Sequence, residues 1–298
     1  MQVDIQKVAV LGSGTMGQGI AQTLAVGGFT VHLRDVDQSL LDRAMAKTRQ
    51  NLDKFFVQKG KMTEAEAADH LGRISTFVDT AEAVGDVDFV IEAIPEDMGR
   101  KKKTFAELDQ LCPPHTILAT NTSVMSVTGI AGATKRPERV IGMHFLNPVA
   151  VMKLVEIVTP LGVAEDTVEA ACHVAVRMGK EPIRTKDTPG FIVNRLLVAV
   201  YNTGAQLVLD GVASAEDVDK ALRLGANWPM GPCELADFGG LDIVLDASEG
   251  IAHYTENPKD ATCLLYKKMV EAGRLGRKNG RGFYDYDDQG GKTPAKLL

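Results

Sequence analysis

Short apolar runs alternate with longer segments of helical periodicity over the first two thirds of the chain. This alternation is typical of a mainly parallel sheet in an α/β fold. The runs are apolar along most of their length, as expected for strands that helices cover on both faces. The pattern predicts eight strands, at Lys7–Leu11, Thr30–Asp35, Ile74–Phe77, Val87–Ala93, Thr116–Thr120, Arg139–His144, Lys153–Val158 and Pro182–Thr185.

The interval between the second and third strands is too long for one short crossover helix. Its periodicity predicts a helix over Ser39–Lys59, and a capping box of Thr63 and Glu66 predicts the start of a second helix that ends near Gly72. We therefore expect a helical hairpin that projects from the sheet. It would carry three lysines toward solvent, Lys54, Lys59 and Lys61.

The pattern changes at Asp187–Gly190, after which we expect only helices. Their predicted ranges are Phe191–Asp210, Ser214–Gly225, Leu241–Tyr254 and Thr262–Ala272. The first of these is apolar nearly all round, so it must be buried in a bundle or against a second copy of the chain. We expect an α/β domain over residues 1–187, an all-α domain over residues 188–298, and a homodimer formed through the helical domain.

Composition excludes several classes of protein. With 33 Lys and Arg against 39 Asp and Glu, the net charge of −6 offers no general attraction to nucleic acid. The four cysteines are widely spaced and form no Cys/His cluster, so no metal site is expected. The sequence shows neither a secretory leader nor an apolar run long enough for a membrane span. These features predict a cytoplasmic protein that is not bound to a membrane.

A glycine-rich turn follows the first strand and opens a helix over Met16–Val26. The turn matches G-x-G-x-x-G, in which the glycines allow a tight turn, close approach to a pyrophosphate and helix packing. The helix N-terminus adds unpaired N–H groups for phosphate oxygens. The motif predicts a Rossmann-type domain that binds a dinucleotide through Gly12, Gly14, Thr15, Met16 and Gly17.

An acidic residue ends the second strand at the spacing that this fold uses. Asp35 lies 18 residues after Gly17 and can accept hydrogen bonds from the adenosine ribose, which favours NAD over NADP. Arg34 points to the opposite face of the strand and is poorly placed for a 2′-phosphate. Asp37 is a competing acidic candidate, although its position suits the cap of the hairpin helix better.

Polar residues at three other strands are candidates for catalysis: Ser123, His144 and Glu156. A histidine beside a buried carboxylate is a common arrangement for a general base, because the carboxylate orients the imidazole and stabilises its cation. Taken singly, however, His144 could be a structural histidine and Glu156 could pair with a lysine or arginine. Asn194 could bond to a neighbouring helix, although its position just after Pro189 and Gly190 favours contact with a ligand between the domains.

Together these segments resemble the 3-hydroxyacyl-CoA dehydrogenase family along nearly the whole chain. The resemblance is closest to the short 3-hydroxybutyryl-CoA dehydrogenases. One departure is Val124, where the family commonly has a second serine in the segment NTSS. The matching segments are VAVLGSGTMGQGIAQ, DFVIEAIPED, LATNTSVMSV, RVIGMHFLNPV, KLVEIV, DTPGFIVNRLL, LGANWPMGPCELADFGGLD and GRGFYDY.

The resemblance implies an NAD-dependent enzyme that acts on acyl-CoA and assigns a role to each site residue. His144 would be the catalytic base with Glu156 as its partner, while Ser123 and Asn194 would orient the substrate. Lys54 and Lys59 of the hairpin would contact CoA. The residues implied near the nicotinamide and its ribose are Glu92, Lys101, Asn121 and Asn147.

Two other functions remain open at this point. A related β-hydroxyacid or sugar-acid dehydrogenase could share the fold and a His/Glu pair. A non-catalytic NAD-binding structural or sensor protein is a different class, against which the joint presence of Ser123, His144, Glu156 and Asn194 argues.

Overall fold

A computed structural model describes residues 5–297 of the 298-residue chain. The chain divides into two compact units, one ending at Thr188 and the other beginning at Pro189. The expected boundary lies one residue earlier. Each unit has a hydrophobic core of its own.

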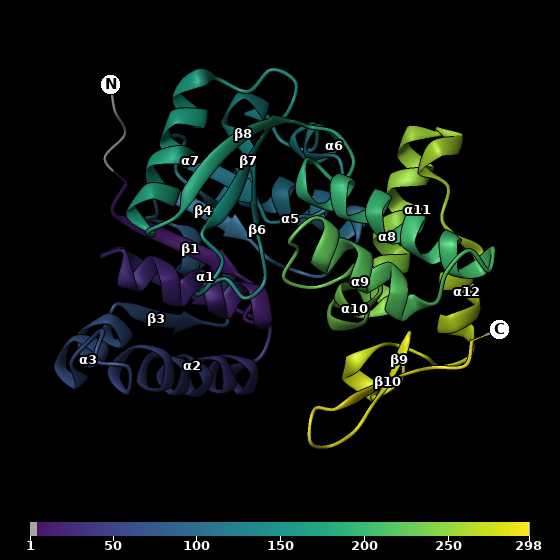
Figure 1. Cartoon of the computed structure of the whole chain (residues 1–298). Helices are drawn as coiled ribbons and strands as arrows, with labels where there is room; N and C mark the ends of the chain where they lie inside the picture. The colour runs from purple at the N-terminus through teal and green to yellow at the C-terminus, as the bar shows by residue number, and fades with distance from the viewer. Residues whose placement is uncertain (1–4, 298) are drawn as a thin grey trace. The chain divides into compact units, whose positions relative to one another are not determined.

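The first unit is built on one eight-stranded sheet (Figure 1), whose strand order is β3-β2-β1-β4-β5-β6-β7-β8. All eight expected strands are present, each within two residues of its expected bounds. Neighbours are parallel throughout, except that β7 runs antiparallel to β6. The strands are β1 Lys7–Leu11, β2 Thr30–Arg34, β3 Ile74–Phe77, β4 Phe89–Glu92, β5 Ile117–Thr120, β6 Val140–Phe145, β7 Leu154–Thr159 and β8 Glu181–Lys186.

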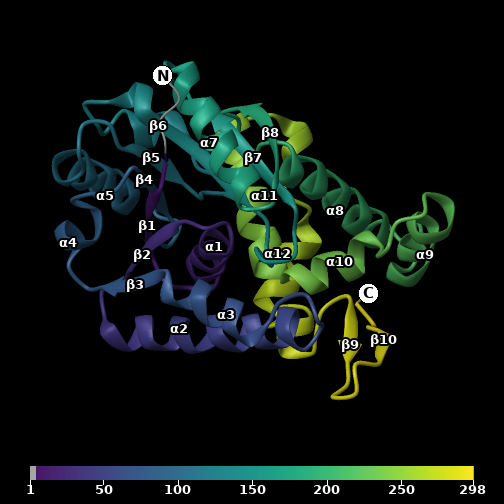
Figure 2. The ribbon, with the colours of Figure 1, turned by 90° about the vertical axis from the view of Figure 1, so that its left-hand side faces the viewer.

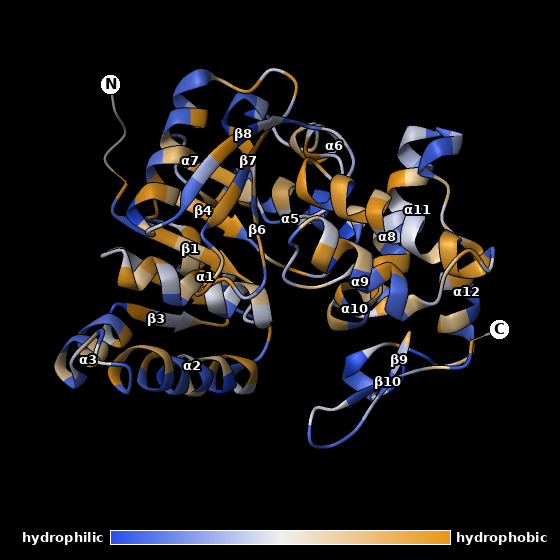
Figure 3. Ribbon diagram, viewed as in Figure 1, coloured by the Kyte–Doolittle hydropathy of each residue, from blue (hydrophilic) through white to orange (hydrophobic). Residues whose placement is uncertain are grey.

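Helices lie on both sides of this sheet (Figure 2), which explains the continuously apolar strands. On one face, a single core joins alternate strand residues to α1 (Thr15–Val26), α2 (Gln38–Leu52) and α7 (Glu165–Arg177). Figure 3 shows the strands mostly in apolar colours and many polar residues along α2 and α3. The other face carries α4 (Thr80–Val84), α5 (Met98–Leu111) and α6 (Val127–Ala131).

The predicted hairpin is present, with one local difference. Its first helix is not a single α-helix, because α2 is followed by a π-helical turn, η1 (Asp53–Val57), before α3 (Glu64–Gly72) begins. Asp37 caps α2 by accepting a hydrogen bond from the Ser39 amide, as expected. The predicted capping box at Thr63 is also confirmed. Both helices of the hairpin also contact α1, so the hairpin is packed against the first unit and does not simply project from the sheet.

The second unit is helical, as predicted, with two additions. One is the helix α10, which the sequence pattern did not reveal. The other corrects the expectation that strands stop at residue 187, because the tail forms an antiparallel pair of strands. The elements of this unit are α8 Val193–Leu209, α9 Ala215–Gly225, α10 Pro232–Gly239, α11 Leu241–Thr255, α12 Leu264–Glu271, β9 Tyr284–Tyr286 and β10 Lys292–Pro294, with short 3₁₀ turns at Pro258–Asp260 and Arg277–Asn279. A further 3₁₀ turn, Pro137–Arg139, precedes β6 in the first unit. Within residues 5–297, no helix combines the length and apolarity needed to cross a membrane.

Buried carboxylates fasten this tail to the helices. Asp237 accepts hydrogen bonds from the amides of Phe283 and Tyr284, at 2.9 and 3.0 Å, and from the Tyr286 hydroxyl at 3.0 Å. A Cβ at Gly282 would lie 2.0 Å from the Asp237 carboxylate, so the tail can approach this closely only with glycine there. Burial nevertheless raises the pKa of Asp237 to about 6.

This raised pKa predicts how the stability of the second unit depends on pH. A carboxyl whose folded-state pKa exceeds its unfolded value favours folding at low pH, and that contribution is lost as the pH rises from about 4 to about 6. Asp237→Asn should lower the free energy of unfolding by about 1–3 kcal/mol. The substitution replaces one accepting carboxylate oxygen with an NH₂ group, which is itself a donor and faces the donors of the tail. The deficit should be larger at pH 5 than at pH 7.5 in thermal unfolding of the two proteins.

Tyr286→Phe is the matched control, since it removes one donor and keeps the carboxylate with both of its amide bonds. Its deficit should be smaller than that of Asp237→Asn. If the Asp237→Asn deficit grew with pH, the pKa of Asp237 would be lowered by its donors and the assignment would be wrong.

Candidate active site

The carboxyl ends of four parallel strands meet at one edge of the sheet, where open α/β sheets bind their ligands. There the glycine turn follows β1, Glu92 ends β4, Asn121–Ser123 follow β5 and His144 lies near the end of β6. The topology therefore gathers the predicted polar residues of these four strands at a single edge.

His144 and Glu156 form a buried pair across two antiparallel strands. They occupy directly opposite positions in the register of β6 and β7, which brings their side chains together. His144 Nδ1 lies 2.6 Å from Oε2 of Glu156, whose side chain is 0% exposed. Because an ionised carboxylate can only accept, Nδ1 is the donor, and Nε2 of the neutral ring carries the lone pair. An imidazole oriented by a carboxylate in this way has the chemistry that a general base requires.

Glu92 is held by groups of the protein itself. Its carboxylate pairs with Lys101 Nζ at 2.7 Å and accepts hydrogen bonds from the Thr120 hydroxyl and the Ile94 amide, each at 2.7 Å. Glu92 is 0% exposed and Lys101 1% exposed. This ion pair ties β4, β5 and α5 together, and these contacts account for both charges without a ligand.

Glu96, which the sequence pattern did not single out, lies beside the predicted substrate residue Ser123. Its carboxylate accepts hydrogen bonds from the Ser123 amide at 2.8 Å and from the Thr122 hydroxyl at 2.9 Å, and it lies 3.3 Å from Lys101 Nζ. Unlike Glu92, its side chain is 38% exposed. The sequence signal that could have identified Glu96 as a site residue is its position just after the end of β4, where open α/β sheets bind ligands.

Two of the three candidate asparagines flank the His144 strand. Asn121 Oδ1 accepts a hydrogen bond from the Phe145 amide at 3.0 Å, which joins the ends of β5 and β6. Asn147 lies in the turn after β6, where it is exposed.

The glycine turn has the features of a phosphate cradle. A Cβ at Gly12 would lie 2.6 Å from the Ala93 carbonyl oxygen, and one at Gly17 would lie 1.8 Å from the Gly12 carbonyl oxygen. Gly14 faces open space, with nothing within 4 Å of a Cβ placed there. No side chain caps the N-terminus of α1, where Thr15 and Met16 form the first turn, so backbone N–H groups remain for an anion. These residues fit a dinucleotide pyrophosphate.

Asp35 stands at the end of β2 beside this turn. Its Oδ2 accepts hydrogen bonds from the Ser13 amide and hydroxyl, at 2.7 and 2.6 Å, and its Oδ1 accepts one from the Val36 amide. A carboxylate has about four lone-pair sites, so capacity remains for a ribose hydroxyl. Arg34 donates instead to the carbonyl of Val78.

The remaining predicted residues lie on other elements. Asn194 is half-buried in the first turn of α8, in the second unit. Lys54 and Lys59 are exposed around η1, and both ammonium groups lie 5.5 Å from the centre of the Phe55 ring. Within the described range, no group of three or more His, Cys, Asp or Glu side chains could hold a metal ion.

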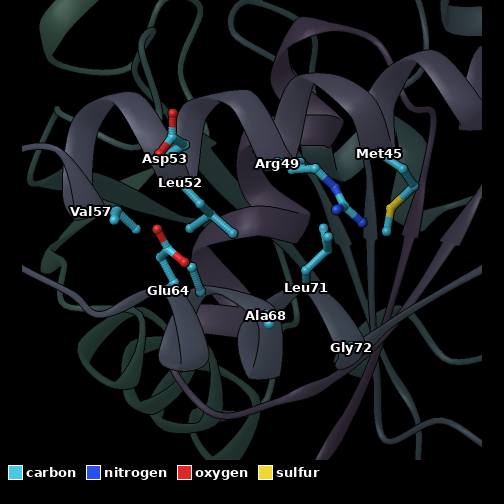
Figure 4. A pocket seen from close by; sticks show the side chains of 10 residues that line it. Met45, Arg49, Leu52, Asp53, Val57, Glu64, Ala68, Leu71 and Gly72 are labelled. Carbon is cyan, nitrogen blue, oxygen red and sulfur yellow. The ribbon is translucent and has the colours of Figure 1, made fainter.

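A separate hollow of about 590 Å³ lies between α2 and α3. Figure 4 shows Met45, Arg49 and Leu71 among the side chains that line it. No residue from the strand ends contributes to its walls. The hollow is therefore distinct from the candidate active site.

Two family models match the chain. The model described as "3-hydroxyacyl-CoA dehydrogenase, NAD binding domain" matches residues 7–188. The model described as "3-hydroxyacyl-CoA dehydrogenase, C-terminal domain" matches residues 190–286. The first match confirms the predicted cofactor, NAD, and both confirm the resemblance read from the sequence motifs.

Individual proteins resemble the chain over nearly its full length. A probable 3-hydroxybutyryl-CoA dehydrogenase of Bacillus subtilis is 45% identical over 287 residues, covering 96% of this chain and 99% of that protein. The 3-hydroxybutyryl-CoA dehydrogenase of Clostridioides difficile is also 45% identical, covering 94% and 99%. The crystal structure of (S)-3-hydroxybutyryl-CoA dehydrogenase from Ralstonia eutropha has a TM-score of 0.92 at 39% identity, covering 96% of this chain and 100% of that one.

The glycine geometry predicts different effects for two substitutions in the turn. Gly14→Ala should fold with little loss of stability, because its Cβ meets nothing, but should weaken NADH binding at least about tenfold by blocking close approach of the pyrophosphate. Gly17→Ala should destabilise the protein strongly, since its Cβ would overlap the Gly12 carbonyl. Thermal unfolding and NADH fluorescence titration measure the two effects.

Gly72→Ala is the control, because it has equal space at the end of α3, away from the turn. It should bind NADH as the wild type does. Unchanged NADH affinity in Gly14→Ala would remove the turn from the dinucleotide site.

Proposed function

Because this chain belongs to the 3-hydroxyacyl-CoA dehydrogenase family of NAD-dependent oxidoreductases, we propose that it interconverts (S)-3-hydroxybutyryl-CoA and acetoacetyl-CoA. The names of the most similar relatives support a four-carbon acyl group. The observation that carries the proposal is the buried pair of His144 and Glu156.

His144 acts in this proposal as the general base. Its Nε2 takes the proton of the 3-hydroxyl group, and the carboxylate of Glu156 stabilises the imidazolium that forms. When bound, NAD serves as the hydride acceptor for C3 of the substrate. In the reverse direction, the imidazolium returns its proton to the 3-keto oxygen.

The other predicted residues bind and orient. Ser123 and Asn194 would hydrogen-bond the substrate oxygen and the thioester region. The glycine turn would hold the pyrophosphate and Asp35 the adenosine ribose. Asn121, Asn147 and the Glu92–Lys101 pair would lie near the nicotinamide half of NAD. The exposed carboxylate of Glu96 is better placed than the buried carboxylate of Glu92 to meet a ribose hydroxyl.

The first experiment follows NADH oxidation with acetoacetyl-CoA and, separately, with acetoacetate. Acetoacetyl-CoA should be turned over, and His144→Gln should lower kcat by about 10²–10⁴-fold, the usual contribution of positioned acid–base catalysis, while NADH binding is kept. Acetoacetate should react far more slowly, because it lacks the CoA portion that supplies binding energy.

His115→Gln is the matched control for that substitution. His115 also faces a carboxylate, that of Asp88 at 3.5 Å, but it is exposed and should not affect turnover. Absence of turnover with acetoacetyl-CoA would overturn the proposed substrate. Equal rates with acetoacetate would favour a CoA-independent hydroxyacid dehydrogenase, and NADH binding without any turnover would favour a sensor.

The hairpin supports the assignment of an acyl-CoA substrate. Lys54 and Lys59 bring two positive charges to the same ring, that of Phe55, which is 37% exposed. The two ammonium groups can bind phosphate oxygens, and the ring can stack on an aromatic base. We propose that it receives the nucleotide end of CoA.

Lys54→Gln combined with Lys59→Gln should therefore raise the KM for acetoacetyl-CoA about tenfold. The kcat and the KM for NADH should stay within twofold of the wild type, because the reacting groups are untouched. Lys47→Gln, on the exposed side of α2, is the control. An unchanged KM for acetoacetyl-CoA in the double variant would place the CoA nucleotide elsewhere.

We also propose that the protein is a homodimer joined through its helical unit. Several large apolar side chains of that unit are exposed, a composition that suits burial against a second copy. They are Leu196, Leu207, Phe238, Ile243 and Leu264.

A further inference from the structure

Lys180 is a buried charge to which the proposed mechanism gives no role. It lies between α7 and β8, is 7% exposed, and its ammonium donates hydrogen bonds to the backbone carbonyls of Val149 and Met152. Within residues 5–297, no carboxylate forms an ion pair with it. Burial lowers its pKa. A lysine kept in such surroundings needs a reason, because desolvating its charge is costly.

The two carbonyls belong to the turn that connects β6 to β7. This turn, residues 146–153, carries Asn147 and joins the strand of His144 to the strand of Glu156. The next residue, Glu181, holds the far end of the same turn, because its amide donates to the Lys153 carbonyl at 2.8 Å. Residues 180 and 181 therefore fasten the turn at three carbonyls.

The turn is held from its other side by the helix of the glycine fingerprint. A Cβ at Gly19, in α1, would lie 3.0 Å from Cβ and 3.2 Å from Cγ2 of Val149. The Val149 side chain thus packs directly on the α1 backbone while its carbonyl accepts from Lys180. This double contact sets the position of the turn relative to the helix whose N-terminus would bind the pyrophosphate.

We propose that Lys180 is a positioning residue for the nicotinamide half of NAD. Through Val149 and Met152 it holds the turn against α1, so that Asn147 meets the nicotinamide end of a dinucleotide whose pyrophosphate lies at the start of the same helix. This inference rests on the proposed function, which assigns Asn147 to that end of the cofactor. Lys180 itself touches neither cofactor nor substrate.

The test compares two ligands that share the adenosine and pyrophosphate but differ in the nicotinamide. Lys180→Met keeps an unbranched side chain that is one atom shorter, and it removes the charge and the donors. It should weaken NADH binding about tenfold, measured by calorimetry, and leave ADP-ribose binding within twofold of the wild type. A merely structural role would lower Tm and the folded fraction without separating the affinities of the two ligands. Lys153→Met, an exposed lysine of the same turn, should bind both ligands normally.

Gly19→Ala provides a second route to the same result if Lys180→Met fails to fold. Its new Cβ should displace Val149 by a few tenths of an ångström and produce the same selective loss for NADH. Equal losses for NADH and ADP-ribose, or no loss for either, would overturn the proposal. Selective loss together with a wild type that does not reduce acetoacetyl-CoA would sustain the positioning role and reject only the proposed substrate.

Discussion

A carboxylate that solvent does not reach sets the arrangement of the site. Glu156 is fully buried in β7, where an unpaired charge would cost several kcal/mol. His144 satisfies it because β7 runs antiparallel to β6 and places the two residues opposite each other. A parallel neighbour would have required a crossover of a dozen or more residues, whereas residues 146–153 are enough here. The antiparallel direction of β7 therefore brings together a histidine and a glutamate that are only 12 residues apart in the sequence.

The sequence was most informative where structure follows from local chemistry. Apolar runs located the strands, and the capping box at Thr63 located the start of α3, because burial and capping depend on nearby residues. The direction of β7, the tail strands and the partners of Glu92 depend on residues distant in sequence, and the pattern of residue types could not supply them. The sequence alone does not distinguish Glu92 from Glu96 as a ligand for a ribose hydroxyl. Only the fold shows that the Glu92 carboxylate binds Lys101 and Thr120, whereas the Glu96 carboxylate is exposed beside Ser123.

Buried charge serves the same purpose at three places in the chain. The Glu92–Lys101 pair binds both the amide and the carbonyl of Ile94, Lys180 holds the turn after β6, and Asp237 holds the tail. The first two groups tie a loop to a helix or strand, and Asp237 ties the start of the β9 strand to the helix α10. A buried polar group is stable only when its hydrogen bonds are satisfied, so each segment is restricted to an arrangement that satisfies them.

The steric crowding in the glycine turn has a consequence for how such chains diverge. Gly12 and Gly17 are demanded by the backbone alone, since any side chain there would strike a carbonyl group. Selection for folding would preserve both even in a descendant that had stopped using its cofactor. Gly14 faces open space, so folding does not require glycine there, and the residue could be substituted once the cofactor is no longer used. The middle glycine is therefore the part of the fingerprint that reports whether a dinucleotide is still in use, whereas Asp35 also serves the turn by accepting hydrogen bonds from Ser13.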